Sequence, residues 1–399
     1  MLITQRDDAR PGGPLSGLRV VELAGIGPAP FACMLLADLG ADVVRVDRAD
    51  GERAFGTWHR VLDRGRRSVA LDLKHPDGTE AVLRLAERAD VLVEGFRPGV
   101  AERLGIGPAV CAERNPALVY ARMTGWGQDG PLSRAPGHDI NYIALSGALH
   151  AIGTGGGPPV PPVNLLGDFA GGGLYLAVGV LAALHERRTS GRGQVVDTAI
   201  VDGTASLLGM LIGMAEAGEW QGGRGDNLLD GGAPYYTVYA CADGGHVAVG
   251  ALEDRFYAAL LDGLGLDAAL VPDRSDRAGW PALRELFAAR FATRTRDDWA
   301  AVFDGTEACV SPVLSVTEAV AHPHHAARGT YLRDDTGVQP GPAPRFGRTT
   351  ATVPPPAPRP GEHTREVLAE CGWSGADTER LLRTGAARDA HRHGATTRA

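Results

Sequence analysis

A histidine and an aspartate thirty residues apart each stand at the predicted start of a helix. His138 follows a chain-breaking Pro136-Gly137 pair, and apolar residues at helical spacing follow it between Ile140 and Ala148. The N–H groups at a helix start are unpaired and the helix dipole is positive there, which disfavours an imidazolium. We therefore expect His138 to stay neutral and to accept a proton near neutral pH.

Asp168 begins the second predicted helix, in the segment GDFAGGG. The same field at the helix start is expected to favour its ionised form. The three glycines at 171–173 cost ~1 kcal/mol each in a helix relative to alanine, so another group is expected to approach this backbone closely. An aspartate cap or a single histidine before a helix is commonly structural. Together, His138 and Asp168 predict a base and an acid that face one another, and thus an α/β enzyme with proton-transfer or acyl chemistry.

Short runs rich in valine and leucine alternate with helical segments in the first half of the chain, which is typical of βαβ units. The expected strands are 18–23, 41–47, 68–73, 90–96 and 118–126. We predict an α/β fold with an open, parallel, doubly wound sheet in a Rossmann-like large domain, followed by a smaller α+β domain. The expected boundaries are 1–194 for the large domain, 195–237 for a linker helix region, 238–318 for the small domain, 319–375 for a return segment to the large domain and 376–399 for a disordered tail.

The composition excludes several classes of protein. A formal net charge of −8 argues against a nucleic-acid partner. Five cysteines without paired spacing, and an N-terminus with no apolar signal region, fit a cytoplasmic protein. The apolar run Phe169–Leu184 is 16 residues long, which is short of the roughly 20 needed to cross a bilayer, so we expect a buried helix and no membrane contact. Glycine is in excess, at 55 of 399 residues, and is expected in structured turns.

The turn after the first strand only partly matches a dinucleotide-binding loop. Gly25 and Gly27 follow the strand, and Asp47 ends the next one, as in that motif. The third glycine is replaced by Pro30, and prolines at 28 and 30 remove N–H donors that would hold a pyrophosphate. A tight strand-to-helix turn is the better interpretation than NAD(P) binding.

Eight segments of the chain resemble the family III coenzyme A-transferase superfamily (CaiB/BaiF) and, within it, the α-methylacyl-CoA racemases. The segments are GLRVVELAGIGPAP, LLADLGADVVRVDR, EGFRPGVAERLGIG, YARMTGWGQDGP, GHDINYIALSGALHAIG, PPVNLLGDFAGGG, GQVVDTAIVDG and LLDGGAPYYTVYACADG. The similarity extends from about residue 15 to about residue 348, and the pair GHDINY and GDF-x-GGG is specific to the racemase branch.

The resemblance implies an isomerase that inverts the α-carbon of a 2-methylacyl-CoA thioester by 1,1-proton transfer through an enolate. His138 would serve the S substrate and Asp168 the R substrate, from opposite faces of the enolate. No metal or separate cofactor is expected, since coenzyme A enters as part of the substrate. Backbone N–H groups at the start of the Asp139 helix or in the glycine-rich turn would stabilise the enolate oxygen.

The resemblance also implies an interlocked homodimer and a set of contacts to coenzyme A. Glu253 matches a carboxylate that reaches the histidine from the second subunit and could orient His138. The positions that match coenzyme A contacts are Arg48, Leu71, Asp72, Leu73, Lys74, Gly95, Phe96, Arg97, Arg103, Gly137, Asp139 and Tyr142. The arginine-rich segment 51–67 departs from the family pattern. Its arginines, which include Arg64, Arg66 and the neighbouring Arg67, could touch the phosphates of coenzyme A or simply be solvated.

Two alternatives stay open at this point. The C-terminal GEHTREVLAECGWSGADTERLLRTG resembles the ending of the transferase branch, in which the aspartate at the position of Asp168 is a nucleophile that forms an acyl anhydride. A non-catalytic acyl-CoA-binding homologue is the second alternative. His322, His324 and His325 lack metal-ligand spacing and are interpreted as a loop.

Overall fold

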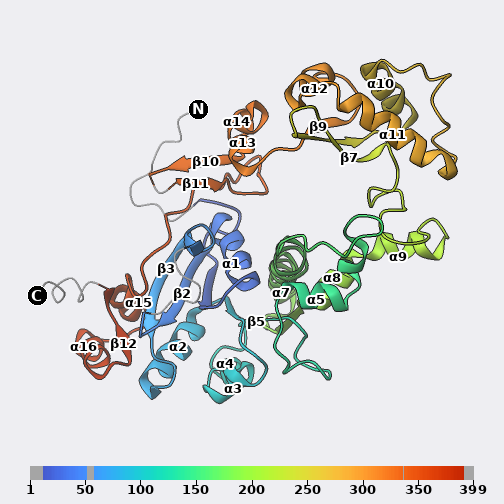
Figure 1. Ribbon diagram of the computed structural model, residues 1–399. Coiled ribbons are helices and arrows are strands. Elements are labelled where there is room, and N and C mark those ends of the chain that lie inside the picture. Colours follow the sequence, from blue (N-terminus) through green and yellow to red (C-terminus); the bar gives the residue numbers. More distant parts are fainter. Residues whose placement is uncertain (1–11, 52–57, 336, 391–399) are drawn as a thin grey trace, which may run out of the picture. The chain divides into compact units, whose positions relative to one another are not determined.

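The computed structural model describes residues 12–51, 58–335 and 337–390 of the chain (Figure 1). The chain divides into two compact units. The first comprises Met1–Ser146, Val163–Leu207 and Leu332–Ala399, and the second comprises Gly147–Pro162 and Leu208–Tyr331. Each unit has hydrophobic core residues of its own.

A large, mainly parallel sheet organises the first unit. In the described residues its strand order is β12-β3-β2-β1-β4-β5-β6. All neighbours pair in parallel except β12, which runs antiparallel to β3. The prediction of a mixed α/β fold with a parallel sheet is confirmed. The strands are β1 (Arg19–Leu23), β2 (Asp42–Arg48), β3 (Arg66–Leu71), β4 (Val91–Glu94), β5 (Val119–Thr124), β6 (Val195–Ala199) and β12 (Ala387–Arg388).

Helices cover both faces of this sheet, because the strands are apolar on both sides. Val21 and Leu92 face one core, which includes residues of α2 and α15, whereas Val20 and Val91 face the other, which includes residues of α1 and α7. The helices and remaining strands of this unit are α1 (Pro28–Asp38), η1 (Trp58–Arg60), α2 (Pro76–Arg88), α3 (Val100–Arg103), α4 (Pro108–Arg114), α5 (Asp139–Leu145), η2 (Leu165–Leu174), α7 (Tyr175–Ser190), α8 (Ile200–Leu207), β10 (Tyr331–Asp334), β11 (Gly337–Pro340), α15 (Thr364–Glu370) and α16 (Gly375–Thr384).

The strand order reverses its direction between β1 and β4. The turns that follow these two strands therefore leave the sheet toward opposite faces, and a crevice opens between them at the carboxyl edge. In doubly wound sheets this position is where ligands bind.

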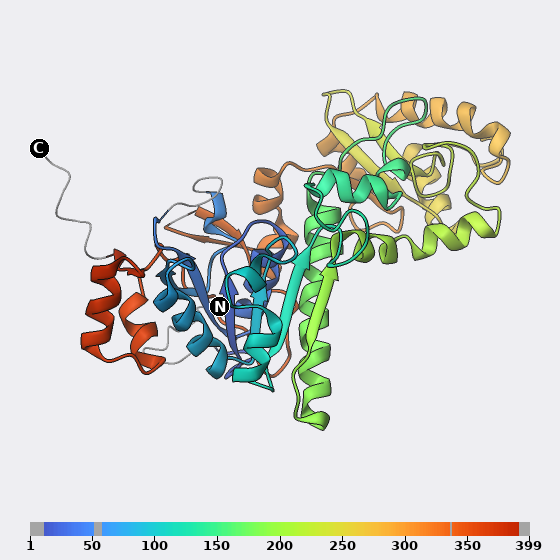
Figure 2. The same cartoon turned by 90° about the horizontal axis from the view of Figure 1, so that it is seen from below.

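The second predicted helix is in fact two consecutive helical segments. Residues 165–174 form the π-helix η2, and the chain continues directly into α7, which packs against β5 and β6 (Figure 2). The combined run Leu165–Ser190 has the length and composition to cross a membrane, and 39% of its most apolar 18-residue window is buried. The prediction that this helix is too short to cross a bilayer, made from Phe169–Leu184, is therefore wrong. The absence of membrane contact stays a prediction.

The three glycines of η2 allow other helices, rather than a ligand, to approach. A Cβ on Gly172 would lie 2.9 Å from Cβ of Pro28, and one on Gly173 would lie 2.6 Å from the ring of Phe31. A Cβ on Gly171 would overlap with the hydroxyl of Thr204 in α8. The predicted close approach exists, but its partners are α1 and α8.

The second unit is smaller and combines an antiparallel three-stranded sheet with helices around Phe287, Phe291 and Trp299. Its elements are α6 (Ala148–Ala151), α9 (Gly209–Glu216), β7 (Tyr236–Ala240), β8 (His246–Gly250), α10 (Asp254–Leu264), η3 (Arg277–Gly279), α11 (Trp280–Phe291), α12 (Arg296–Phe303), β9 (Val310–Pro312), α13 (Val316–Ala321) and α14 (Pro323–Arg328). The predicted His322–His325 loop is wrong, since residues 323–328 form α14.

The chain departs from several of the predicted boundaries. The second unit also includes residues 147–162, assigned to the large domain, residues 208–237, assigned to the linker region, and residues 319–331, assigned to the return segment. Residues 195–207, assigned to a linker region, form β6 and α8 of the first unit. The prediction of a disordered tail from 376 is wrong as far as residue 390, because α16 and β12 occupy this stretch and Leu381 is buried in a core. The tail escaped prediction because β12 is only two residues long and gains its order from pairing with β3. Residues 391–399 lie outside the described part of the chain.

The close contact between η2 and α8 leads to a stability prediction. A Cβ on Gly203 would overlap with the carbonyl oxygen of Gly171, so Gly203→Ala should lower the free energy of unfolding by about 1–3 kcal/mol. Urea unfolding measures this change. The matched control is Gly375→Ala at the start of α16, where a Cβ meets no atom within 4 Å, and it should stay within about 0.5 kcal/mol of the parent. Equal stability of both variants would contradict the packing described here.

Candidate active site

A cavity of about 470 Å³ opens at the carboxyl edge of the sheet, and every residue that lines it belongs to the first unit. Its walls include Ile26–Ala29 after β1, Gly95–Pro98 after β4 and Met123–Trp126 at the end of β5. This is the crevice that the reversal of strand order creates. His138 and Asp168 both line it, so the fold brings together the two residues predicted to act as base and acid.

His138 caps the N-terminus of α5, as predicted. Its backbone is extended, with φ −133° and ψ 174°, and its N–H donates a hydrogen bond of 3.0 Å to Oδ1 of Asn141. This bond fixes the start of the helix. The imidazole is on the exposed side of the helix start and lines the cavity.

Asp168 lies in the first turn of the π-helix η2. Its backbone N–H donates a 2.6 Å hydrogen bond to Oδ1 of Asp139, and its Oδ2 accepts a 3.2 Å hydrogen bond from the amide of Asn164. Gly27, with φ +67°, lies directly against this carboxylate, because a Cβ there would be 3.0 Å from Oδ2. A glycine after β1 thus suits both the left-handed backbone and the approach of Asp168.

The pKa of Asp168 is raised from its ordinary value, mainly because the carboxyl is largely removed from solvent. The negative charge of Asp139 raises the pKa further, whereas the hydrogen bond from Asn164 and the charge of His138 lower it. The expectation that the helix start favours the ionised form is therefore wrong, since burial outweighs it. A carboxyl with a raised pKa is better able to donate as well as accept a proton near neutral pH.

Asp139 connects the two helix starts. Its side chain is buried and accepts hydrogen bonds from the backbone N–H groups of Asp168 and Gly167, which lower its pKa against the larger raising effect of burial. It is predicted to contact coenzyme A, but its carboxylate bonds to η2 and is absent from the cavity lining in the described residues. The neighbours His138 and Asp139 thus have different surroundings.

Tyr142 forms part of the cavity wall. Its ring packs edge-on against Trp126, with centroids 4.7 Å apart, and its hydroxyl donates to the carbonyl oxygen of Gly137. A Cβ on Gly125 would overlap with this ring, and one on Gly137 would lie 2.7 Å from it. Both glycines are therefore needed where they stand.

Comparisons with known proteins identify the family of the chain. The sequence model of CoA-transferase family III matches residues 15–364. The chain belongs to CoA-transferase family III. It is 50% identical over 362 residues to alpha-methylacyl-CoA racemase of Mus musculus and 47% identical over 364 residues to that of Homo sapiens, in both cases over 90% of this chain and 94% of the relative. A CaiB/BaiF family structure from Brucella suis superposes with a TM-score of 0.79 at 26% identity, over 90% of this chain and all of that one.

The predicted coenzyme A contacts of this family III chain fall into two groups. Gly95, Phe96, Arg97, Gly137 and Tyr142 line the cavity. The others, apart from Asp139, do not line the cavity in the described residues. Arg48 ends β2 and residues 71–74 end or follow β3, at the same edge of the sheet, whereas Arg103 ends helix α3. Of these, Leu71 is buried and Leu73 packs against the core, so only their backbone is available to a ligand. Glu253, which flanks α10 in the second unit, is exposed, and its role stays a prediction.

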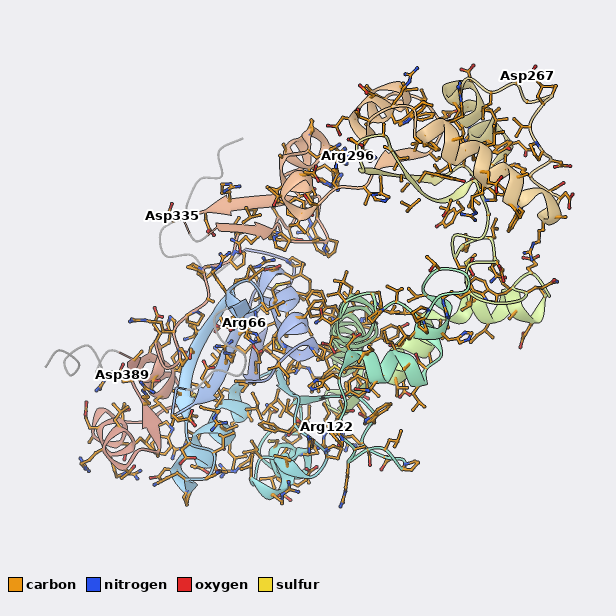
Figure 3. The ribbon with its side chains drawn as sticks, viewed as in Figure 1. Arg66, Arg122, Asp267, Arg296, Asp335 and Asp389 are labelled. Atoms are coloured by element: carbon orange, nitrogen blue, oxygen red, sulfur yellow. The ribbon has the colours of Figure 1, made fainter. Side chains whose placement is uncertain are left out.

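The turn after β4 is held by charged residues that were not among the predicted site residues. Oε2 of the buried Glu94 accepts a 2.6 Å hydrogen bond from the N–H of Phe96, and its Oε1 accepts one of 2.9 Å from Arg122. Arg122, which is labelled in Figure 3, also forms a 2.9 Å ion pair with Glu102, the neighbour of Arg103. The sign available in the sequence was one charged residue in each of these two strands, VLVE and VYARMT.

The expected phosphate contacts of the segment 51–67 are wrong for its three described C-terminal arginines. Each one is held by carboxylates: Arg64 pairs with Asp38 at 2.6 Å, Arg66 with Glu22 at 2.9 Å, and Arg67 with Asp42, Glu366 and Glu370. Arg64 and Arg66 are also buried. Residues 52–57 lie outside the described part of the chain. In the described residues, no group of three or more His, Cys, Asp or Glu side chains is arranged to hold a metal ion.

The surroundings of Asp168 predict the effect of removing Asn164. The amide of Asn164 stabilises the ionised carboxylate, so Asn164→Ala should raise the pKa of Asp168 further and move its titration to higher pH. Carbon NMR of labelled aspartate side chains, assigned with Asp168→Asn, measures this titration. Ser133→Ala, another change in the cavity wall, should leave it in place. A shift to lower pH in Asn164→Ala would contradict the hydrogen-bond assignment.

Proposed function

We propose that this chain is a racemase that inverts the α-carbon of 2-methylacyl-CoA thioesters by proton transfer. The observation that carries the proposal is the presence of His138 and Asp168 in one cavity, on two different helices. The names of the relatives at 50% and 47% identity support the same reaction. Family membership supplies the coenzyme A thioester as the class of substrate.

Inversion at the α-carbon needs two groups, because a single base would return the proton to the face it came from. One of His138 and Asp168 takes the α-proton, which leaves a planar enolate of the thioester. The other delivers a proton to the opposite face. The raised pKa of Asp168 suits a group that must be an acid in one direction and a base in the other. Bonds and electrons balance without a redox partner, so we expect no separate cofactor.

The enolate oxygen needs hydrogen-bond donors, and one well-placed donor is worth about 2.7–4 kcal/mol in the transition state. The N–H groups of Asp139 and Ile140 in the first turn of α5 lie next to His138 and are the better candidates, because a helix leaves its first N–H groups without intrahelical partners. The glycines 171–173 are less suitable, because α1 and α8 occupy the space beside them.

An apolar strip on the outer surface of η2 and α7 supports a homodimer. The side chains of Leu174, Val178 and Leu181 follow one another at helical spacing and are exposed by 45%, 64% and 37%. Leu165, at 61%, extends the strip. Exposed apolar patches of this kind mark interaction sites. We take the partner to be a second copy of the chain, which would also supply Glu253 to His138.

A hydrogen-exchange experiment tests the reaction. A 2-methylacyl-CoA of one configuration is incubated with the protein in D₂O, and the α-proton and the configuration are followed by NMR and chiral analysis. We expect deuterium at the α-carbon with inversion, reduced at least about 100-fold in both His138→Ala and Asp168→Ala, since each removes a proton-transfer group. Ser133→Ala is the matched cavity control.

The same reaction mixture separates the alternatives. Transfer of coenzyme A to an added free acid without deuterium at the α-carbon would overturn the racemase proposal. That outcome, with an intermediate trapped by hydroxylamine and lost only in Asp168→Ala, would favour a transferase with Asp168 as nucleophile. Binding of the thioester without exchange or transfer would favour a non-catalytic protein.

The apolar strip gives a prediction on assembly. Val178→Glu places a charge in the middle of the strip and should shift the protein from dimer to monomer in sedimentation velocity, since burying an unpaired charge is costly. Arg188→Glu, a charge change near the end of the same helix, should leave the dimer intact. A wild-type protein that sediments as a monomer at micromolar concentration would contradict the proposal.

A further inference from the structure

The C-terminal strand β12 lies beside a segment predicted to contact coenzyme A. In the register of the sheet, Ala387 is opposite Leu71 and Arg388 is opposite Ala70. The N–H of Asp72 donates a 2.9 Å hydrogen bond to the carbonyl oxygen of Ala386. Residues 386–388 are therefore built into the sheet edge at which β3 ends and residues 72–74 follow.

The side chain of Arg388 crosses from β12 to the segment that follows β2. Its Nη1 donates a 2.8 Å hydrogen bond to the carbonyl oxygen of Asp50. Gly51, with φ +74°, makes room for the guanidinium, because a Cβ there would overlap with Nη1. This glycine thus creates the space in which a cation from the far end of the chain is seated.

Arg388 joins two other cations at this corner of the sheet. Arg48 ends β2, forms a 2.6 Å ion pair with Asp50, and its side chain is 69% exposed. Lys74 follows β3. The nearest carboxylate in sequence does not neutralise Arg388, because Asp389, labelled in Figure 3, is paired with Arg365.

The hydrogen bond to Asp50 does not use all the N–H donors of Arg388. A guanidinium has five N–H groups, and among the described residues the buried Nε of Arg388 has no hydrogen-bond partner. A purely structural arginine elsewhere in this sheet, such as Arg66, is paired with a carboxylate and with backbone carbonyls. Among the described residues, the guanidinium of Arg388 donates to one backbone carbonyl, that of Asp50. It lies between the ends of β2 and β3, where residues are predicted to bind coenzyme A.

We propose that β12 completes the binding site for the nucleotide end of coenzyme A and that Arg388 is a further contact to its phosphates. A guanidinium binds phosphate oxygens with directed, charge-assisted hydrogen bonds. Arg48, Lys74 and Arg388 would then form the local positive group that a chain of net charge −8 needs to hold a polyanion. This inference rests on the proposed function only for the identity of the ligand as an acyl-CoA.

The decisive experiment compares two substrates that differ only in the nucleotide. α-Proton exchange is measured for a 2-methylacyl-CoA and for the same acyl group on pantetheine, which lacks the phosphates. Arg388→Gln should raise KM for the CoA thioester about tenfold with little change in kcat, and should leave the pantetheine thioester unaffected. Arg388→Lys, which keeps the charge, should recover most of the affinity. Arg383→Gln, an exposed arginine on α16, is the matched control.

Direct binding separates this inference from the proposed function. Calorimetry with adenosine 3′,5′-bisphosphate and with free coenzyme A should show the same tenfold weakening in Arg388→Gln and a steeper fall of wild-type affinity with salt than that of the variant. If the wild type catalyses no proton exchange but this weakening is found, the racemase proposal fails and the inference stands.

Two results would overturn the role of Arg388. One is an unchanged affinity for coenzyme A in Arg388→Gln. The other is an equal loss on the CoA and pantetheine thioesters together with a lower Tm, which would mean that Arg388 only anchors the chain end. Thermal unfolding of Arg388→Lys distinguishes a folding defect, because this variant retains the charge.

Discussion

Buried pairs of arginine and carboxylate hold the carboxyl edge of the sheet together. Arg66 on β3 reaches across β2 to Glu22 on β1, and both side chains are fully buried. The guanidinium of Arg66, which is labelled in Figure 3, also donates to the carbonyl oxygens of Pro30 in α1 and of Leu62, which lines the cavity. A buried charge without its partner costs several kcal/mol, so these groups have little freedom to separate. One arginine therefore fixes the positions of two strands, a helix and part of the cavity wall.

A second pair does the same on the other side of the reversal in strand order. Arg122 on β5 binds Glu94 at the end of β4, and the other oxygen of Glu94 fixes the N–H of Phe96 in the cavity wall. Burial raises the pKa of Glu94, while the bonds from Phe96 and Arg122 lower it. The crevice between β1 and β4 thus has a charged clamp on each side, which is the support that a precisely shaped site requires.

Local patterns in the sequence were sufficient for some of these features. Apolar runs gave the parallel strands, and the Pro-Gly break before His138 gave the start of α5, because both depend on neighbouring residues. The roles of Arg64 and Arg66, the raised pKa of Asp168 and the pairing of β12 depend on residues distant in the chain. In a sequence, an arginine that contacts a ligand looks the same as one that pairs with a buried carboxylate. The predictions for Arg64 and Arg66 failed for this reason, and the pairing of β12 could not be predicted.

The two aspartates of the candidate site differ because of what each one accepts. Asp139 accepts hydrogen bonds from the backbone N–H groups of Gly167 and Asp168, so its carboxylate holds the start of η2. Among the described residues, Asp168 accepts from one side-chain amide, that of Asn164, and it lines the cavity with a pKa that burial and Asp139 both raise. Since Asp139 is the neighbour of His138, one short helix carries one proton-transfer group, holds the backbone of the other and adjusts its proton affinity. A displacement of α5 would therefore disturb both groups at once. The backbone at Gly125 and Gly137 lies against Tyr142 of this helix, and the backbone at Gly167 lies against Asp139, so α5 has little room to move.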